Sequence, residues 1–152
     1  MANKHRTDIE YNIAMEYPGY NIEGCYTSVS YHRNGTANKS QWAVSVDIEF
    51  DLFAKAKNDG QIFDDKGYSL WILDGEAKVL GYTEHSSETR LARFEDGTRS
   101  NRWHGYPANY LKTKNDIPPM SLLIKWKESG IIEKSVITRL KQQKPCVLQR
   151  SL

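Results

Sequence analysis

The most regular hydrophobic pattern in this chain is an alternation of apolar and polar residues between Trp42 and Phe53. Acidic side chains take every second position at Asp47, Glu49 and Asp51. A period of two places successive side chains on opposite faces of a strand. The pattern therefore predicts a half-buried strand over residues 42–53, with an apolar face formed by Trp42, Val44, Val46, Ile48, Phe50 and Leu52.

Two shorter elements are predicted before this strand. Thr7 and Glu10 have the spacing of a capping box and predict a short N-terminal helix that ends at Pro18. Alternation over residues 25–32 predicts a strand that is followed by a turn at Asn34-Gly35.

Two Asp-Gly pairs predict β-hairpins, because this dipeptide tolerates the positive φ angles of a two-residue turn. The hairpins are 68–73 with 76–84 through Asp74-Gly75, and 89–95 with 98–104 through Asp96-Gly97. A two-residue turn in the second hairpin places Glu95 opposite Thr98.

Beyond Pro107 the period becomes helical. Gly130 separates two amphipathic stretches, whose apolar residues are Leu122, Leu123 and Trp126 in the first and Val136, Ile137 and Leu140 in the second. We therefore expect an α+β fold: a mostly antiparallel sheet of about six strands in meander hairpins, a short N-terminal helix, and two C-terminal helices packed on one face. A single domain over residues 1–152 is expected, with a mobile tail at 146–152.

Charge is distributed unevenly along the chain. Of the 152 residues, 39% are hydrophobic and 26% are charged, as in a folded protein. Residues 1–88 hold 8 Lys/Arg and 14 Asp/Glu, whereas residues 89–152 hold 13 and 5. A basic half attracts anionic partners, so we expect nucleic acid or an acidic protein as the partner. Opposite charged faces also make a homo-oligomer a possible assembly.

The expected binding residues are basic and aromatic side chains of this second half. A twisted hairpin studded with arginines suits phosphate contacts, and neighbouring aromatic rings offer stacking surface. The set comprises Arg90, Arg93, Arg99, Arg102, Trp103, His104, Tyr106, Lys134, Arg139 and Lys141. The alternative is that nearby carboxylates such as Glu95 pair with these arginines and leave them as ordinary surface charge.

The run from Arg102 to Pro107 has the highest concentration of side chains that could take part in catalysis. In an enzyme, His104 would act as acid or base, Arg102 would stabilise charge on a phosphorane, and Tyr106 would orient the substrate or donate a proton. This pattern is compatible with a small metal-independent ribonuclease-type enzyme. A structural role for Trp103 and Tyr106 between sheet and helices explains the same residues.

Other chemistries have weak sequence support. The carboxylates of residues 47–51 suit an acidic solvated face better than a magnesium site, and the four histidines lack metal-ligand spacing. Cys25 and Cys146 are expected to be reduced thiols in a cytoplasmic protein, without a membrane span or a cofactor. The sequence thus favours a non-enzymatic binding protein whose basic C-terminal half engages nucleic acid or another anionic partner. The alternatives are the ribonuclease-type enzyme and a protein-protein interaction or inhibitor module with complementary acidic and basic faces.

Overall fold

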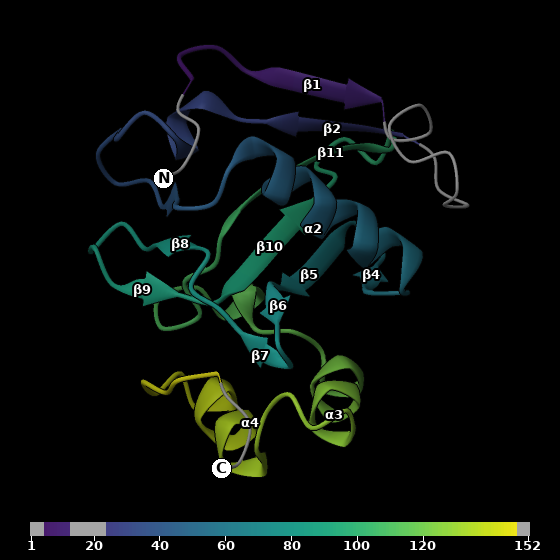
Figure 1. Cartoon of the computed structure of the whole chain (residues 1–152), viewed down its shortest axis with the longest axis vertical. Coiled ribbons are helices and arrows are strands. Elements are labelled where there is room, and N and C mark those ends of the chain that lie inside the picture. Colours follow the sequence, from purple (N-terminus) through teal and green to yellow (C-terminus); the bar gives the residue numbers. More distant parts are fainter. Residues whose placement is uncertain (1–4, 13–23, 149–152) are drawn as a thin grey trace.

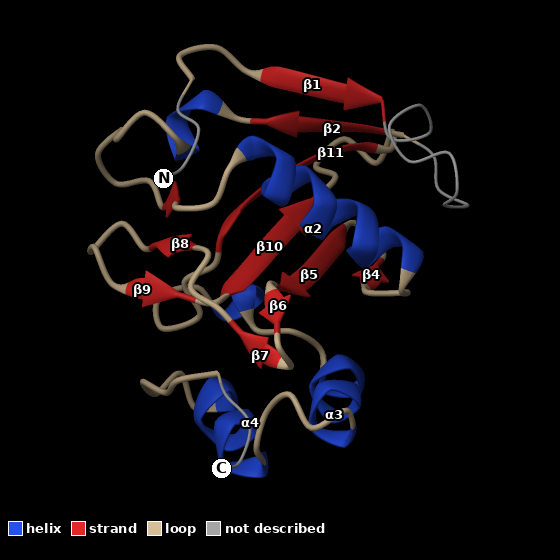
Figure 2. Ribbon diagram, viewed as in Figure 1, coloured by secondary structure: helices blue, strands red, loops and turns tan. Residues whose placement is uncertain are grey.

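The computed structural model describes residues 5–12 and 24–148, and within them the fold is α+β (Figures 1 and 2). Its centre is a mixed six-stranded sheet in which all neighbours are antiparallel except β2 and β11, which run parallel. In spatial order the strands are β1 (Ile9–Asn12), β2 (Cys25–Ser28), β11 (Arg102–Pro107), β10 (Leu91–Glu95), β5 (Lys66–Leu70) and β4 (Ile62–Phe63). The expected fold class is therefore confirmed in its coarse form.

Smaller elements surround this sheet. A three-stranded sheet contains β3 (Gln41–Trp42), β8 (Gly81–Tyr82) and β9 (Glu88–Thr89), and a two-stranded hairpin contains β6 (Ile72–Leu73) and β7 (Glu76–Ala77). Two 3-10 helices are η1 (Ser30–His32) and η2 (Lys114–Asp116). The turn predicted at Asp74-Gly75 is present, with positive φ at both residues between β6 and β7. The flanking strands are shorter than predicted, since β5 pairs with β10 and β8 pairs with β3 and β9.

The prediction of a strand over residues 42–53 is wrong from Val46 onwards, where the chain forms helix α2 (Val46–Asn58). Ser45 caps this helix by accepting a hydrogen bond from the Ile48 N–H at 3.3 Å. Asp47 and Glu49 lie in the first turn, where negative charge is favourable to the helix dipole. The buried residues of α2 do not follow the alternation of apolar and polar positions, because Phe53, Ala54 and Ala56 are also buried. Figure 1 shows α2 crossing one face of the sheet.

The described part of the predicted N-terminal helix is also different, since Ile9–Asn12 is strand β1, paired antiparallel with β2. Asp8, next to this strand, accepts a hydrogen bond from the Ser30 N–H at 2.8 Å. This long-range pairing replaces the local capping that the sequence suggested. The remainder of that predicted helix lies outside the described residues.

The second predicted hairpin exists, but its turn is longer than two residues. The last pair of β10 and β11 is Glu95 with His104, so residues 96–101 form the connection. Asp96 organises this loop, because its carboxylate accepts hydrogen bonds from the N–H groups of Ser100 and Asn101 at 3.2 and 2.7 Å. Arg99 and Asn101 adopt positive φ within it. The register of the hairpin is therefore displaced from the predicted one.

Helices α3 (Met120–Glu128) and α4 (Lys134–Lys141) follow on either side of Gly130, whose φ of +77° permits the break between them. Their buried residues form a hydrophobic core with Tyr68, Leu70 and Leu91 of the sheet. A separate core lies between α2 and the opposite sheet face, around Tyr26, Phe53, Phe94 and Trp103. No helix in the described ranges is long and apolar enough to cross a membrane.

Candidate active site

Strands β10 and β11 bring four polar side chains to one face of the sheet. Arg93 lies opposite Tyr106, and Glu95 lies opposite His104. Because side chains alternate along a strand, these four point away from the face that Phe94 buries against α2. The two strands thus form a platform of ionisable groups on the side of the sheet away from α2.

Gly105 holds the two strands close at this platform. A Cβ atom at this position would lie 2.3 Å from Cδ1 of Phe94, the residue paired with it. Since carbon atoms do not approach so closely, any side chain at Gly105 would push β11 away from β10. The glycine of the sequence run 102–107 therefore supports the alignment of His104 with Glu95.

His104 and Glu95 form a hydrogen-bonded imidazole-carboxylate pair. The His104 Nε2 atom lies 3.2 Å from Oε1 of Glu95. The hydrogen bond from His104 lowers the pKa of Glu95 below its ordinary value, so this carboxyl is ionised at neutral pH. A carboxylate in this position fixes the orientation of the ring and stabilises positive charge that forms on it during proton transfer.

Arg93 connects Glu95 to Asp116 through two ion pairs. Arg93, only 3% exposed, lies with Nη2 3.5 Å from Oε2 of Glu95 and with Nη1 3.2 Å from Oδ1 of Asp116. Tyr106 donates its hydroxyl proton to the same oxygen of Asp116 at 2.8 Å. Burial, together with the negative charge of Asp116, raises the pKa of Tyr106, so its hydroxyl keeps its proton. Tyr106 is thus a fixed hydrogen-bond donor to Asp116.

A second histidine, His32 of η1, lies beside the first. Its ring stacks on Tyr106, with the centroids 5.5 Å apart. Its Nδ1 atom lies 2.8 Å from the carbonyl oxygen of Ser40, so Nδ1 carries the proton and Nε2 is an acceptor. Burial lowers the pKa of His32 to about 4. The His32 ring is therefore neutral at pH 7.

The low pKa of His32 predicts a pH-dependent stability. The unfolded chain binds a proton on His32 below its ordinary pKa of about 6.5, whereas the folded chain does so only below about pH 4. Stability therefore falls as the pH decreases through this window, by about 2 kcal/mol from pH 7 to pH 5. Urea unfolding of the wild type and His32→Gln at both pH values measures it. The variant should lose about 2 kcal/mol less than the wild type, and an equal loss in both proteins would contradict the assignment.

These groups line a polar pocket of about 250 Å³. Its wall includes His32, Glu95, His104, Tyr106 and Asp116, together with Lys39 and Tyr31. The Nζ atom of Lys39 lies 4.9 Å from the centre of the Tyr31 ring, which is itself exposed. The pocket therefore combines two imidazoles in different environments with a cation and an aromatic surface.

The sequence-predicted site residues are only partly brought together. Arg93, His104 and Tyr106 meet at this platform, but the other hairpin arginines have separate partners. Arg99 lies 3.2 Å from Asp64, Arg102 lies 3.7 Å from Glu10, and Arg90 donates to the Ala77 carbonyl oxygen at 3.1 Å.

Trp103 is buried on the opposite face, in the core under α2. Arg102 therefore lies among the residues around β1 and is not a lining residue of the pocket.

The remaining predicted binding residues belong to α4, outside this pocket. Lys134 and Lys141 are exposed on that helix, and the Nη1 atom of Arg139 lies 3.5 Å from the Pro145 carbonyl oxygen. Near them, Cys146 is a free thiol whose pKa is raised by burial. These residues form a separate surface of the protein.

Sequence reasoning missed His32 and Asp116 and did not pair Glu95 with His104. The predicted two-residue turn placed Glu95 opposite Thr98, which hid the pair. The signal that was available is the Asp96 side chain, whose bonds to the following N–H groups favour a longer loop. His32 had no such signal, because only the tertiary fold brings η1 to Tyr106.

The described residues contain no group of three His, Cys, Asp or Glu side chains arranged to hold a metal ion. Asp47 and Glu49, considered as ligands, lie on α2, where Glu49 is buried in the core. Comparison of the chain with protein-family models, curated proteins and solved structures gives no match. The function must therefore be argued from the geometry of the pocket.

Proposed function

We propose that this protein is a ribonuclease-type enzyme that cleaves RNA by acid-base catalysis at the pocket of His104 and His32. The observation that carries the proposal is the pair of imidazoles on one pocket in opposed environments, one buried and neutral and one hydrogen-bonded to Glu95. Titratable groups whose environments separate their protonation behaviour are the usual arrangement for an acid and a base.

RNA suits this pair because the substrate supplies its own nucleophile. Nε2 of His32 accepts the proton of the ribose 2′-hydroxyl, and the 2′-oxygen forms a bond to phosphorus. The bond from phosphorus to the 5′-oxygen then breaks, and protonated His104 gives its proton to that leaving oxygen. The products are a 2′,3′-cyclic phosphate and a 5′-hydroxyl. Neither a protein nucleophile nor a change of oxidation state is needed.

The other pocket residues fit a single-stranded substrate. Lys39 supplies a cation beside the pocket for the phosphate, and Tyr31 supplies an exposed ring on which a base stacks. A volume of about 250 Å³ lies just below the range of about 300–1,000 Å³ usual for ligand pockets, so at most one nucleotide unit of a flexible strand would occupy it. In the wall of this pocket, Asp116 is held by its ion pair with the buried Arg93.

The test is incubation of the purified chain with a labelled single-stranded RNA and with the DNA of the same sequence, both in EDTA. We expect cleavage of the RNA to fragments that end in a 2′,3′-cyclic phosphate, and no cleavage of the DNA because it lacks the 2′-hydroxyl. Intact RNA over a panel of sequences, or equal cleavage of DNA, would contradict the proposal.

The non-enzymatic alternative, in which the basic C-terminal half engages nucleic acid or another anionic partner, stays a prediction. Its support now comes from the exposed lysines of α4, Lys134 and Lys141, since the hairpin arginines are paired with carboxylates or carbonyl oxygens. Filter binding of an uncleavable DNA at two salt concentrations tests it, because phosphate contacts weaken steeply as salt rises.

A further inference from the structure

Helices α3 and α4 form an apolar groove with a basic rim. The groove encloses about 520 Å³, and its apolar lining comes from Met120, Ile124 and Ile137. Met120 and Ile124 are exposed, Ile124 at 42%. The rim carries Lys127, Lys134 and Lys141. An exposed apolar surface with a charged rim is typical of a protein-protein contact.

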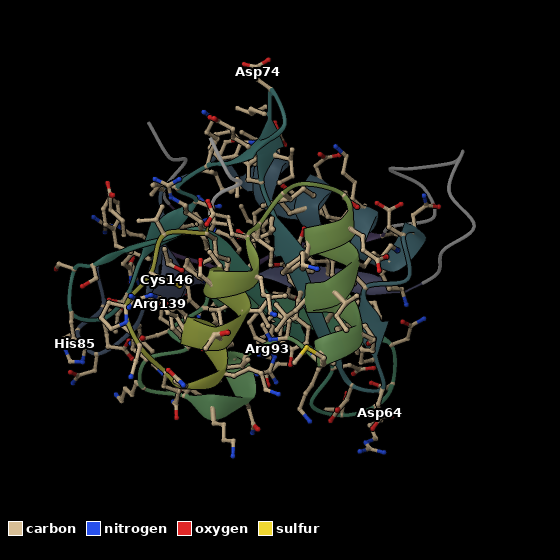
Figure 3. The ribbon with its side chains drawn as sticks, turned by 90° about the horizontal axis from the view of Figure 1, so that it is seen from below. Asp64, Asp74, His85, Arg93, Arg139 and Cys146 are labelled. Atoms are coloured by element: carbon tan, nitrogen blue, oxygen red, sulfur yellow. The ribbon has the colours of Figure 1, made fainter. Side chains whose placement is uncertain are left out.

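The β6–β7 hairpin has complementary properties. Ile72 and Leu73 precede its turn and are both exposed, Leu73 at 45%. Asp74 occupies the turn itself, and Glu76 follows it. Figure 3 shows Asp74 at the far end of this hairpin, projecting away from the body of the protein and from the helices in front. The hairpin is thus an exposed apolar projection with acidic residues at its tip.

From these two surfaces we infer that the chain self-associates head to tail, with the β6–β7 hairpin of one copy seated in the α3–α4 groove of the next. Leu73 would occupy the apolar floor and Asp74 would approach the lysine rim. The charges are of opposite sign, although Lys78 already pairs with Glu76 at 3.0 Å, which leaves Asp74 as the main acidic contributor. This inference does not depend on catalysis at His104.

The geometry defines the kind of assembly. Two different surfaces meet, so the contact is heterologous. An open assembly keeps one free hairpin at one end and one free groove at the other until a ring closes. The tip of the hairpin, residues 72–76, is too small to bury the roughly 800 Å² per partner of a stable interface. The association is therefore weak. Its ionic part is exposed and therefore sensitive to salt.

Sedimentation equilibrium of the full chain over about 20 to 500 µM at low salt measures this association. The weight-average mass should rise at least about 1.5-fold above the 17.5 kDa monomer and fall back in about 0.5 M salt. Leu73→Glu in the hairpin and Ile124→Glu in the groove should each remain monomeric. Both positions are exposed, so the fold is retained, as circular dichroism will verify.

The decisive arm is an equimolar mixture of the two variants. The intact groove of Leu73→Glu and the intact hairpin of Ile124→Glu form one contact, so dimers should return and larger species should not. Matched controls are Leu111→Glu, an exposed leucine elsewhere, and Lys125→Glu, whose Nζ atom donates to the Asp59 carbonyl oxygen. Both should associate like the wild type. A monomeric wild type at 500 µM, or a mixture that stays monomeric, would overturn the inference.

Discussion

Replacement of His104 by alanine is expected to lower the rate of RNA cleavage about a thousandfold. General acid-base groups typically contribute factors of 10² to 10⁴, and alanine removes the proton donor for the leaving oxygen. The side chain is about 30% exposed and makes its described ion pair with Glu95 alone, so the fold should remain intact. Initial rates with a fluorescent RNA measure the loss, and thermal unfolding of the same sample verifies the fold.

Two further variants separate catalysis from structure. Glu95→Gln keeps the shape of the side chain but removes the charge that stabilises protonated His104, so cleavage should fall at least tenfold. His85→Ala changes an exposed histidine that does not line the pocket and should cleave like the wild type. Figure 3 shows His85 at the edge of the protein, well apart from Arg93. If His104→Ala keeps full activity, or if His85→Ala loses as much, the pocket is not the active site.

Replacement of Glu49 by alanine is expected to cause the largest loss of stability, about 3–5 kcal/mol. Its Oε1 atom lies 2.8 Å from Nη2 of Arg33, and the side chains of both residues are fully buried. Tyr26 and Ser28 also donate hydroxyl protons to this carboxylate, at 2.5 and 2.7 Å. Alanine removes the carboxylate that balances the charge of the guanidinium and accepts from both hydroxyls, in the core, where the loss of one partner of a buried ion pair is most costly. Urea unfolding at pH 7 measures the change.

Asp51→Ala on the same helix is the matched control. Asp51 lies 3.6 Å from Lys55 in an exposed pair, so its removal should cost less than about 0.5 kcal/mol. The double replacement Arg33→Met with Glu49→Leu should be more stable than Glu49→Ala, because it removes both charges together. A loss below about 1 kcal/mol for Glu49→Ala would show that this network is not needed for the fold.

The Glu49 network also explains why the sequence misled on this part of the fold. Alternation predicted that Glu49 faces solvent on a strand, whereas it lies on the inner face of α2 with Phe50 and Phe53. A period of two and a period of 3.6 share several positions over a short run, and only the partner Arg33 makes a buried glutamate acceptable. Tertiary pairing of this kind has no local signal. Gly130 and the Asp74-Gly75 turn, by contrast, act through their own φ angles and were predictable.

The candidate site shows the same division between local and tertiary information. His104 and Tyr106 could be selected from the sequence because they cluster in one short run. Their partners depend on register, and a shift of the hairpin decides whether Glu95 faces Thr98 or His104. His32 and Asp116 reach the pocket from η1 and η2, which no periodic pattern connects to β11. The arginines were assigned to an anionic partner because of the positive charge excess of this half of the chain. Some of their carboxylate partners lie far away in the sequence, as Glu10 does from Arg102.

The parallel pairing of β2 with β11 determines when, during synthesis of the chain, the pocket of the proposed activity can form. Because the two strands run in the same direction, η1 leaves β2 alongside the second half of β11, and His32 reaches Tyr106 only through this contact. During synthesis the ribosome releases His32 before His104, so the nascent chain at first holds one half of the proposed catalytic pair without the other. The pocket comes into existence only after β11 has emerged and inserted between β2 and β10. In the proposed enzyme, cleavage of RNA therefore cannot begin before β11 has been synthesised and has taken its place in the sheet.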